Sequence, residues 1–377
     1  MLDMMIDLWT TSGFSQLTLG HIVMIVIACT LLYLGLEKGM EPYLMIPIAF
    51  SMLLVNLPGV DLMVPPTDSS PGGLFYYLYQ GVQFVIFPPL IFLCIGVNID
   101  FGPLIANPKT LLLGGAAQFG IFAAFLLAVA FNFTGPEAAS IGIIGGADGP
   151  TTVFLAGQLA PHLLSQIALA AYSYMALVPV IQPPIIKLLT TKKERQIKME
   201  QLREVSKKEK ILYPIIVSII VILLVPTSAT LLGTLMLGNL LKESGKVPLI
   251  VNALKDSLMY TLTIAIGLAI GATASAELFL TIEVIKIVTL GLVAFAIGTG
   301  AGVIGGKLLC KLTGGKINPI IGAAGVSAMP FAARVVQKIG QEENPNNFLL
   351  MHAMGPNVSG IIASAIAAGL FIQYFAS

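Results

Sequence analysis

The sequence predicts an all-α membrane protein with about ten transmembrane helices plus two re-entrant segments in an inverted-topology repeat. Of its 377 residues, 56% are hydrophobic and only 10% are charged, and the mean hydropathy is +0.91. These values are typical of a polytopic membrane protein. Apolar runs recur along the chain, and two of them are interrupted by glycine and proline.

Ten apolar runs are expected to cross the membrane as helices, because each is close to the roughly 20 residues that span the hydrocarbon core. In chain order they are 18–36, 42–57, 80–98, 110–133, 166–189, 211–226, 228–242, 249–271, 279–308 and 349–372. Residues 58–79 are rich in proline, glycine and aspartate, so we expect a loop there.

Basic side chains predict the orientation of these helices. Residues 187–210 hold 9 of the 20 lysine and arginine residues, and basic loops stay on the cytoplasmic side. With 190–210 as a cytoplasmic loop, alternating crossings bring the other basic clusters to the same side and both termini outside. The formal net charge of +1 gives no indication of a nucleic-acid partner.

The predicted organisation has five parts. They are N-terminal scaffold helices (1–79), a first repeat (80–189) with re-entrant segment 136–160, the cytoplasmic basic loop (190–210), further scaffold helices (211–278), and a second, inverted repeat (279–377) with re-entrant segment 317–339.

The two interrupted runs share a pattern of helix-breaking residues. Gly142, Gly145 and Pro150 recur at the same spacing as Gly322, Gly325 and Pro330. The predicted orientation sends the first segment in from outside and the second in from the cytoplasm. Inverted repeats of this kind place substrate and ion sites near the membrane midplane, where the broken segments meet.

Asp148 is the carboxylate of the first interrupted run, beside Gly149 and Pro150. A charge at mid-bilayer costs about 3 kcal/mol or more, and irregular backbone at that depth is tolerated only where it lines a cavity. We therefore expect a functional site at Asp148, and the alternative is a structural helix cap.

Neutral oxygen donors accompany this carboxylate in the interrupted runs and in the last apolar run. They are Thr151, Thr152, Asn318, Ser327 and Asn357. Hard oxygen ligands with one negative charge and no histidine or cysteine favour an alkali cation over a transition metal. For the two threonines and Ser327, local hydrogen bonds to backbone in a glycine-rich turn remain an equal alternative.

Arg334 is the one arginine inside an apolar run. Its guanidinium has two interpretations, which the residues leave open. It could extend to the membrane surface, or it could offer a planar fork to a carboxylate arriving from the cytoplasm.

Two long motifs resemble one known family. They are G-G-A-D-G-P-T at 145–151 and N-P-I-I-G-A-A-G-V-S-A-M-P-F-A-A-R at 318–334. Both resemble the β subunit of the biotin-dependent, sodium-pumping decarboxylases, and the resemblance covers essentially the whole chain. Members of this family act on oxaloacetate, methylmalonyl-CoA, glutaconyl-CoA or malonate, and the short chain favours the acyl-CoA branch.

The resemblance implies a function and its residues. The β subunit decarboxylates carboxybiotin and exports Na⁺ while a proton is consumed. Na⁺ ligands would be Asp148, Asn318, Ser327 and Asn357; Arg334 would bind carboxybiotin, and Tyr174 or Ser327 would relay the proton. Structural residues at the site would be Gly145, Gly149, Pro150, Gly322, Gly325 and Pro330.

The resemblance also implies partners and a location. These are a carboxyltransferase subunit, a biotin-carrier domain that delivers carboxybiotin, a small single-span subunit, a homotrimer of this chain, and the bacterial cytoplasmic membrane. The alternative hypothesis is a stand-alone Na⁺-coupled secondary transporter or Na⁺/H⁺ antiporter, which would share the broken segments and their oxygen donors.

Overall fold

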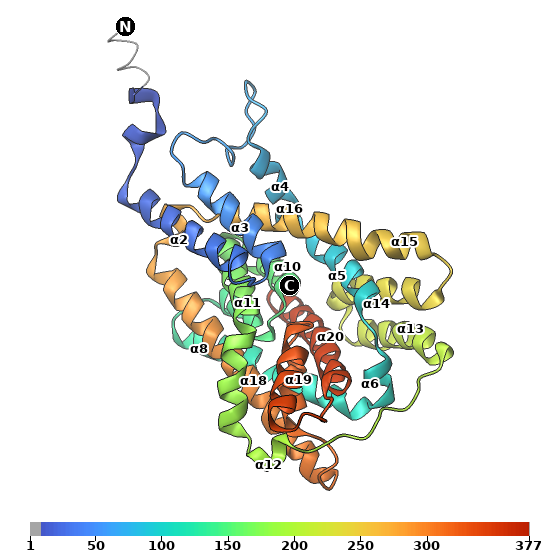
Figure 1. The fold of residues 1–377 in the computed structure, drawn as a ribbon. Helices are drawn as coiled ribbons and strands as arrows, with labels where there is room; N and C mark the ends of the chain where they lie inside the picture. Colours follow the sequence, from blue (N-terminus) through green and yellow to red (C-terminus); the bar gives the residue numbers. More distant parts are fainter. Residues whose placement is uncertain (1–8, 377) are drawn as a thin grey trace. The chain divides into compact units, whose positions relative to one another are not determined.

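Every regular element in the described part of the chain is a helix, as the sequence predicts. A computed structural model describes residues 9–376, without the side chain of Ala176 (Figure 1). The first helices are α2 (Leu19–Leu36), α3 (Pro42–Val55), α4 (Leu74–Gln83), α5 (Phe87–Asn98), α6 (Gly102–Ala106), α7 (Leu111–Ala117), α8 (Phe119–Ala130), α9 (Gly135–Gly142), α10 (Gly149–Leu159) and α11 (Leu164–Leu189). They are followed by α12 (Lys192–Arg195), α13 (Lys207–Leu224), α14 (Ala229–Ser244), α15 (Pro248–Asn252), α16 (Met259–Ala272), α17 (Ala276–Phe279), α18 (Ile282–Leu312), α19 (Phe331–Glu343) and α20 (Leu350–Phe375).

Among residues 9–376, five helical stretches are long and apolar enough to cross a membrane, and two bent pairs would raise the number to seven. The five are α2, 108–130, 248–272, α18 and α20. A multi-pass membrane protein is therefore supported. Every range predicted to cross contains helix, but α14 has only 16 residues and α13 begins with a charged turn. Ten crossings stay a prediction.

The predicted crossing 80–98 is not one straight helix. The structure starts it at Leu74 and breaks it into α4, which ends at Gln83, and α5, which begins at Phe87. Val85 takes a left-handed φ of 58° at the break, and Pro88 with Pro89 follow in the first turn of α5, where they lack the N–H groups needed to continue α4. The predicted crossing 80–98 is thus interrupted just before Pro88 and Pro89.

The contacts divide the chain into two compact units. The first holds residues up to Phe87 together with Tyr260–Lys286. Within it α16 lies close to α3, because Gly267 and Gly271 present only backbone to that helix.

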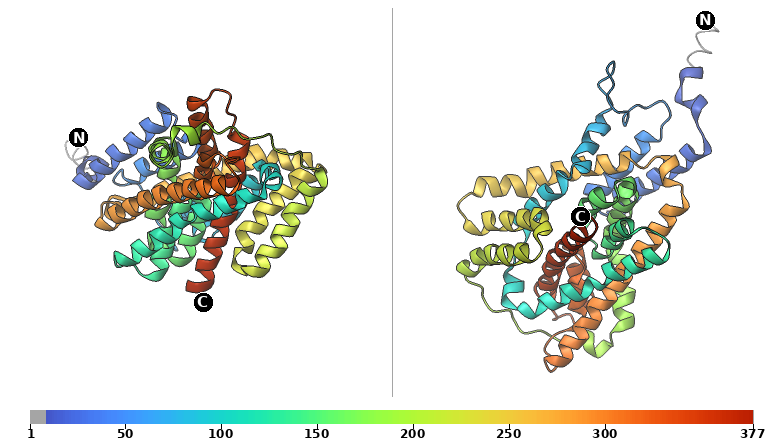
Figure 2. Two further views of the ribbon diagram at one scale, coloured as in Figure 1. Left: turned by 90° about the horizontal axis from the view of Figure 1, so that it is seen from below. Right: turned by 180° about the vertical axis from the view of Figure 1, so that it is seen from behind.

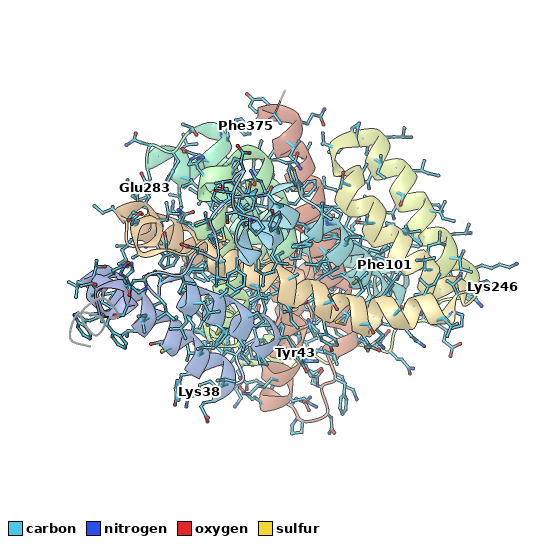
Figure 3. All side chains as sticks on the ribbon, turned by 90° about the horizontal axis from the view of Figure 1, so that it is seen from above. Lys38, Tyr43, Phe101, Lys246, Glu283 and Phe375 are labelled. Atoms are coloured by element: carbon cyan, nitrogen blue, oxygen red, sulfur yellow. The ribbon has the colours of Figure 1, made fainter. Side chains whose placement is uncertain are left out.

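The second unit holds Pro88–Met259 and Ile287–Ser377 and is arranged around α20. Figure 2 shows α18 and the α7–α8 stretch lying side by side, and the carbonyl oxygen of Ala117 would lie 2.9 Å from a Cβ at Gly298. At the end of α20, labelled in Figure 3, the ring of Phe375 lies 5.9 Å from that of Phe125. Both interrupted runs belong to this unit.

The two interruptions predicted from glycine and proline are present. The first run has α9, a 3₁₀ turn η3 (Ile143–Gly146), and then α10. The second begins with the 3₁₀ helix η7 (Pro319–Gly325) and continues as α19 after an irregular connection that starts at Val326, whose backbone is extended. Their re-entrant topology stays a prediction, as does the predicted division of the chain into five parts.

Candidate cation site at two broken segments

Asp148 begins α10 at the point where the first run is broken. Ala147 takes a left-handed φ of 53°, and Asp148 is the extended residue at the helix N-cap. Its Oδ1 accepts from the Thr151 N–H at 3.3 Å, and its Oδ2 accepts from the Thr151 hydroxyl at 2.6 Å. Pro150 stands in the first turn, where its missing N–H costs nothing. The capping role expected as the alternative is therefore real.

Asp148 also accepts a hydrogen bond from a distant helix, which capping does not require. Ser364 of α20 donates to Asp148 Oδ2 at 2.8 Å, and the Ser327 hydroxyl lies 3.4 Å from that of Ser364. The Ser327 N–H donates to the Gly146 carbonyl at 2.8 Å. The two broken segments thus meet directly, and Asp148 and Ser327 are joined through Ser364.

The site is buried and holds one charge. Asp148 is 5% exposed, as is Ser327. No ion pair involves Asp148 anywhere in residues 9–376, and the same residues contain no group of three or more histidine, cysteine or acidic side chains. One carboxylate among hydroxyl and carbonyl oxygens suits an alkali cation.

Asn357 supports the second broken segment from α20. Its amide nitrogen donates to the Ala324 and Val326 carbonyls at 3.0 and 2.9 Å. These carbonyls belong to the end of η7, where the helix leaves them without partners. Asn357 therefore lies beside Ser327, as a shared site requires.

Several glycines let the backbones approach closely around the site. A Cβ at Gly322 would overlap the Gly302 carbonyl of α18, and one at Gly149 would overlap the Tyr172 ring. Gly145 and Gly325 lie similarly against α8 and α7, and Pro330 precedes α19. The glycines thus stand where backbones approach closely, and Pro150 and Pro330 stand where α10 and α19 begin. That these residues shape a binding site stays a prediction.

Asn318 lies at the opposite end of η7 from Ser327 and holds a loop. Its amide nitrogen donates to the Arg195 and Ile197 carbonyls at 3.0 and 2.8 Å, and its oxygen caps Ile320. Asn347 donates to the same two carbonyls at 3.3 and 3.1 Å. We call this arrangement the asparagine clamp. No hydrogen bond joins Asn318 to Asp148 in the part of the chain that the structure describes.

We call Asp148, Thr151, Ser327 and Ser364 the Asp148 group. The other two predicted residues lie outside it. Tyr174 of α11 donates to the Val288 carbonyl of α18. Arg334 is exposed on α19, where its guanidinium lies 5.9 Å from the Phe331 ring centroid. It makes no ion pair with any carboxylate of residues 9–376. A carboxylate ligand could therefore reach Arg334 without displacing a partner.

A cavity of about 910 Å³ opens beneath the loop that follows α12. Its charged and aromatic lining residues are Asp100, Lys198, Glu200, Arg203, Glu204, Lys210, Phe348 and His352. Burial alone would raise the pKa of Asp100, but the Gly102 N–H and the Lys210 ammonium, each 2.9 Å away, lower the pKa below its ordinary value. The basic loop thus covers an open space that is lined by both charged and apolar side chains.

Three residues of this region were not predicted from the sequence. They are Ser364, Gln118 and Gln182, all buried. Ser364 could have been predicted from the sequence, because it follows Asn357 by two helical turns and therefore lies on the same face of α20. The two glutamines are lone amides inside apolar runs and belong to neither of the two motifs.

Comparisons with known proteins agree with the family that the two motifs resemble. Residues 20–375 match the family described as the Na⁺-transporting oxaloacetate decarboxylase β subunit. The chain is 54% identical to the methylmalonyl-CoA decarboxylase subunit β of Propionigenium modestum, over 100% of both chains. It is 54% identical to the glutaconyl-CoA decarboxylase subunit β of Acidaminococcus fermentans, over 96% of this chain and 95% of the other. Identity to the oxaloacetate decarboxylase β chain 2 of Salmonella typhi is lower, 45% over 96% of each chain, in the direction that the chain length favours. The chain therefore belongs to the family of β subunits of the Na⁺-transporting decarboxylases.

Proposed function

We propose that this chain couples the decarboxylation of carboxybiotin to the export of Na⁺ across the membrane, with consumption of a proton. The observation that carries the proposal is the Asp148 carboxylate, held among hydroxyls where two broken segments meet. Membership in the Na⁺-transporting family supports the same function. The alternative of a stand-alone transporter has no comparable support.

The proposed Na⁺ ligands are Asp148, Ser327 and Asn357. Asp148 supplies the charge, and Ser327 reaches it through Ser364. Asn318 would contribute oxygen to a second Na⁺ site only after its hydrogen bonds in the asparagine clamp are released, because all the polar atoms of its side chain are engaged.

Decarboxylation of carboxybiotin yields CO₂ and a ring nitrogen that takes up one proton. Ser327 and Ser364 form a short hydroxyl chain to Asp148 along which that proton can move, whereas the Tyr174 hydroxyl is engaged by Val288.

The proposed assembly follows the family. We propose a carboxyltransferase subunit, a biotin-carrier domain and a small single-span subunit as partners, a trimer of this chain, and insertion in the bacterial cytoplasmic membrane. The loop 190–210 would face the cytoplasm, with both termini outside, ten crossings and inverted re-entrant segments. Carboxybiotin would then arrive on the side of the 910 Å³ cavity.

The decisive experiment uses the complex reconstituted in vesicles. Adding free carboxybiotin should start decarboxylation that requires Na⁺ and moves ²²Na⁺ across the membrane. Omitting this subunit should abolish both. Na⁺ exchange by the isolated subunit at the full rate, without carboxybiotin, would contradict the proposal and favour an independent transporter.

Replacing Arg334 by alanine should raise the KM for carboxybiotin by about tenfold or more, because an Arg–carboxylate hydrogen bond is worth roughly 1.5–3 kcal/mol and tenfold corresponds to about 1.4 kcal/mol. Steady-state kinetics at saturating Na⁺ measure the change. Lys338→Ala removes an exposed charge one turn further along α19 and should leave the KM unchanged. A lowered Tm with an unchanged KM in Arg334→Ala would show that the arginine only anchors its helix.

A further inference from the structure

Four consecutive carbonyls at the end of η7 are held by side-chain amides from three elements. Gln182 of α11 donates to Ala323 at 3.0 Å, and Asn357 of α20 donates to Ala324 and Val326. Gln118, at the break between α7 and α8, lies 3.5 Å from the Gly325 carbonyl. We call these three side chains the amide collar. It satisfies carbonyls that a broken helix leaves exposed.

Each amide of the collar uses its nitrogen to donate these hydrogen bonds, which leaves its oxygen. The oxygens of Gln118, Gln182 and Asn357 are buried and accept no hydrogen bond from any described residue. A buried acceptor without a donor costs about as much free energy as a lost hydrogen bond. An oxygen of this kind that faces the Asp148 group is therefore a candidate ligand for a cation bound there.

Gln118 is the member whose oxygen faces the Asp148 group. Its Oε1 lies 3.4 Å from the point where a Cβ on Gly146 would stand, and Ser364 Cβ lies 3.4 Å from the same point. The hydroxyl of Ser364 is the one that donates to Asp148. The orientation of the amide is fixed, because its nitrogen already donates to the Gly114 carbonyl at 3.1 Å.

We propose that Gln118 supplies a neutral oxygen ligand to the cation that Asp148 holds. The proposal rests on the proposed function, since it assumes Na⁺ binding at Asp148. Oxygen ligands of this kind suit an alkali cation, and replacing one changes both affinity and the preference between Na⁺ and Li⁺. Gln118 is 4% exposed, so that bulk water has little access to take its place.

Two substitutions separate the oxygen of Gln118 from its nitrogen. Gln118→Met keeps the length of the side chain but removes both groups. Gln118→Glu removes the nitrogen and keeps the oxygen, with an added charge. In the purified complex, the Tm is measured against Na⁺, Li⁺ and K⁺, because a cation that binds the folded state raises the Tm. The Met variant should need about tenfold more Na⁺ for the half-maximal shift and should change its Na⁺/Li⁺ preference, whereas the Glu variant should need no more Na⁺ than the native protein.

Gln182→Met is the matched control. It removes the same kind of bond to η7 and another unpartnered oxygen, but we place no cation there. It should lower the Tm without Na⁺ and leave the Na⁺ midpoint unchanged. Equal Na⁺ midpoints in Gln118→Met and the native protein would overturn the proposal, as would a tenfold rise in Gln118→Glu, which would show that the nitrogen matters. Should the Met variant not fold, the Glu variant still decides. If Na⁺ does not raise the Tm of the native complex, Na⁺ binding is refuted, and with it the proposed function.

Discussion

Asp148→Asn is expected to abolish Na⁺-stimulated decarboxylation at millimolar Na⁺. Asparagine has the same shape and can still cap α10 through the Thr151 N–H, so the change removes the charge and spares the fold. A unit charge about 4 Å from a cation contributes roughly 4 kcal/mol at an effective dielectric constant of 20, and this corresponds to about a thousandfold weaker binding. The Na⁺ dependence of carboxybiotin decarboxylation measures the loss.

A buried hydroxyl on the same helix as Ser364 provides the control for that experiment. Ser359 is 1% exposed and donates to the Leu111 carbonyl at 2.9 Å. Ser359→Ala should keep the native Na⁺ dependence, whatever it does to the Tm. Full Na⁺ stimulation in the Asp148→Asn complex would refute the role of this carboxylate.

Gly322→Ala is expected to prevent stable folding of the subunit. A Cβ at this position would overlap the Gly302 carbonyl of α18, and relief would require movement of backbone on either side. Overpacking of this kind costs about 1–3 kcal/mol even where side chains can yield, and here only backbone is available. The yield and Tm of the complex in detergent report the effect.

Gly115→Ala is the matched glycine for comparison. It lies within α7, and a Cβ there meets nothing within 4 Å. Alanine favours a helix over glycine by about 1 kcal/mol, so this variant should be as stable as the native subunit or more so. A Gly322→Ala subunit that assembles with native yield and Tm would show that α18 and η7 separate more easily than their contact implies.

The sequence predicted the parts of this fold that depend on composition and on backbone chemistry. Hydropathy located the helices, because burial in lipid selects apolar side chains along the whole crossing. Glycine and proline located both interruptions, since both residues are poor helix formers and are enriched where helices begin and end. Asp148 was recognisable because a lone carboxylate is costly in such surroundings.

Residues whose role depends on a distant partner were harder to predict. Ser364 matters because it faces Asp148, and Gln118 because it faces Gly146; neither neighbour is visible from local pattern. Asn318 was expected beside the cation, but its position at the start of η7 brings it to the loop after α12. The break at Val85 was missed because Pro88 and Pro89 are compatible with the start of a helix as well as with its continuation from a kink.

The asparagine clamp has a mechanical consequence. Four hydrogen bonds from Asn318 and Asn347 converge on the backbone of Arg195 and Ile197. The start of η7 and the connection between α19 and α20 are therefore both hydrogen-bonded to the same short segment, 195–197. If η7 moves along its axis, the segment 195–197 must move with it or the hydrogen bonds must break. The loop after α12 and the second broken segment are therefore expected to move together.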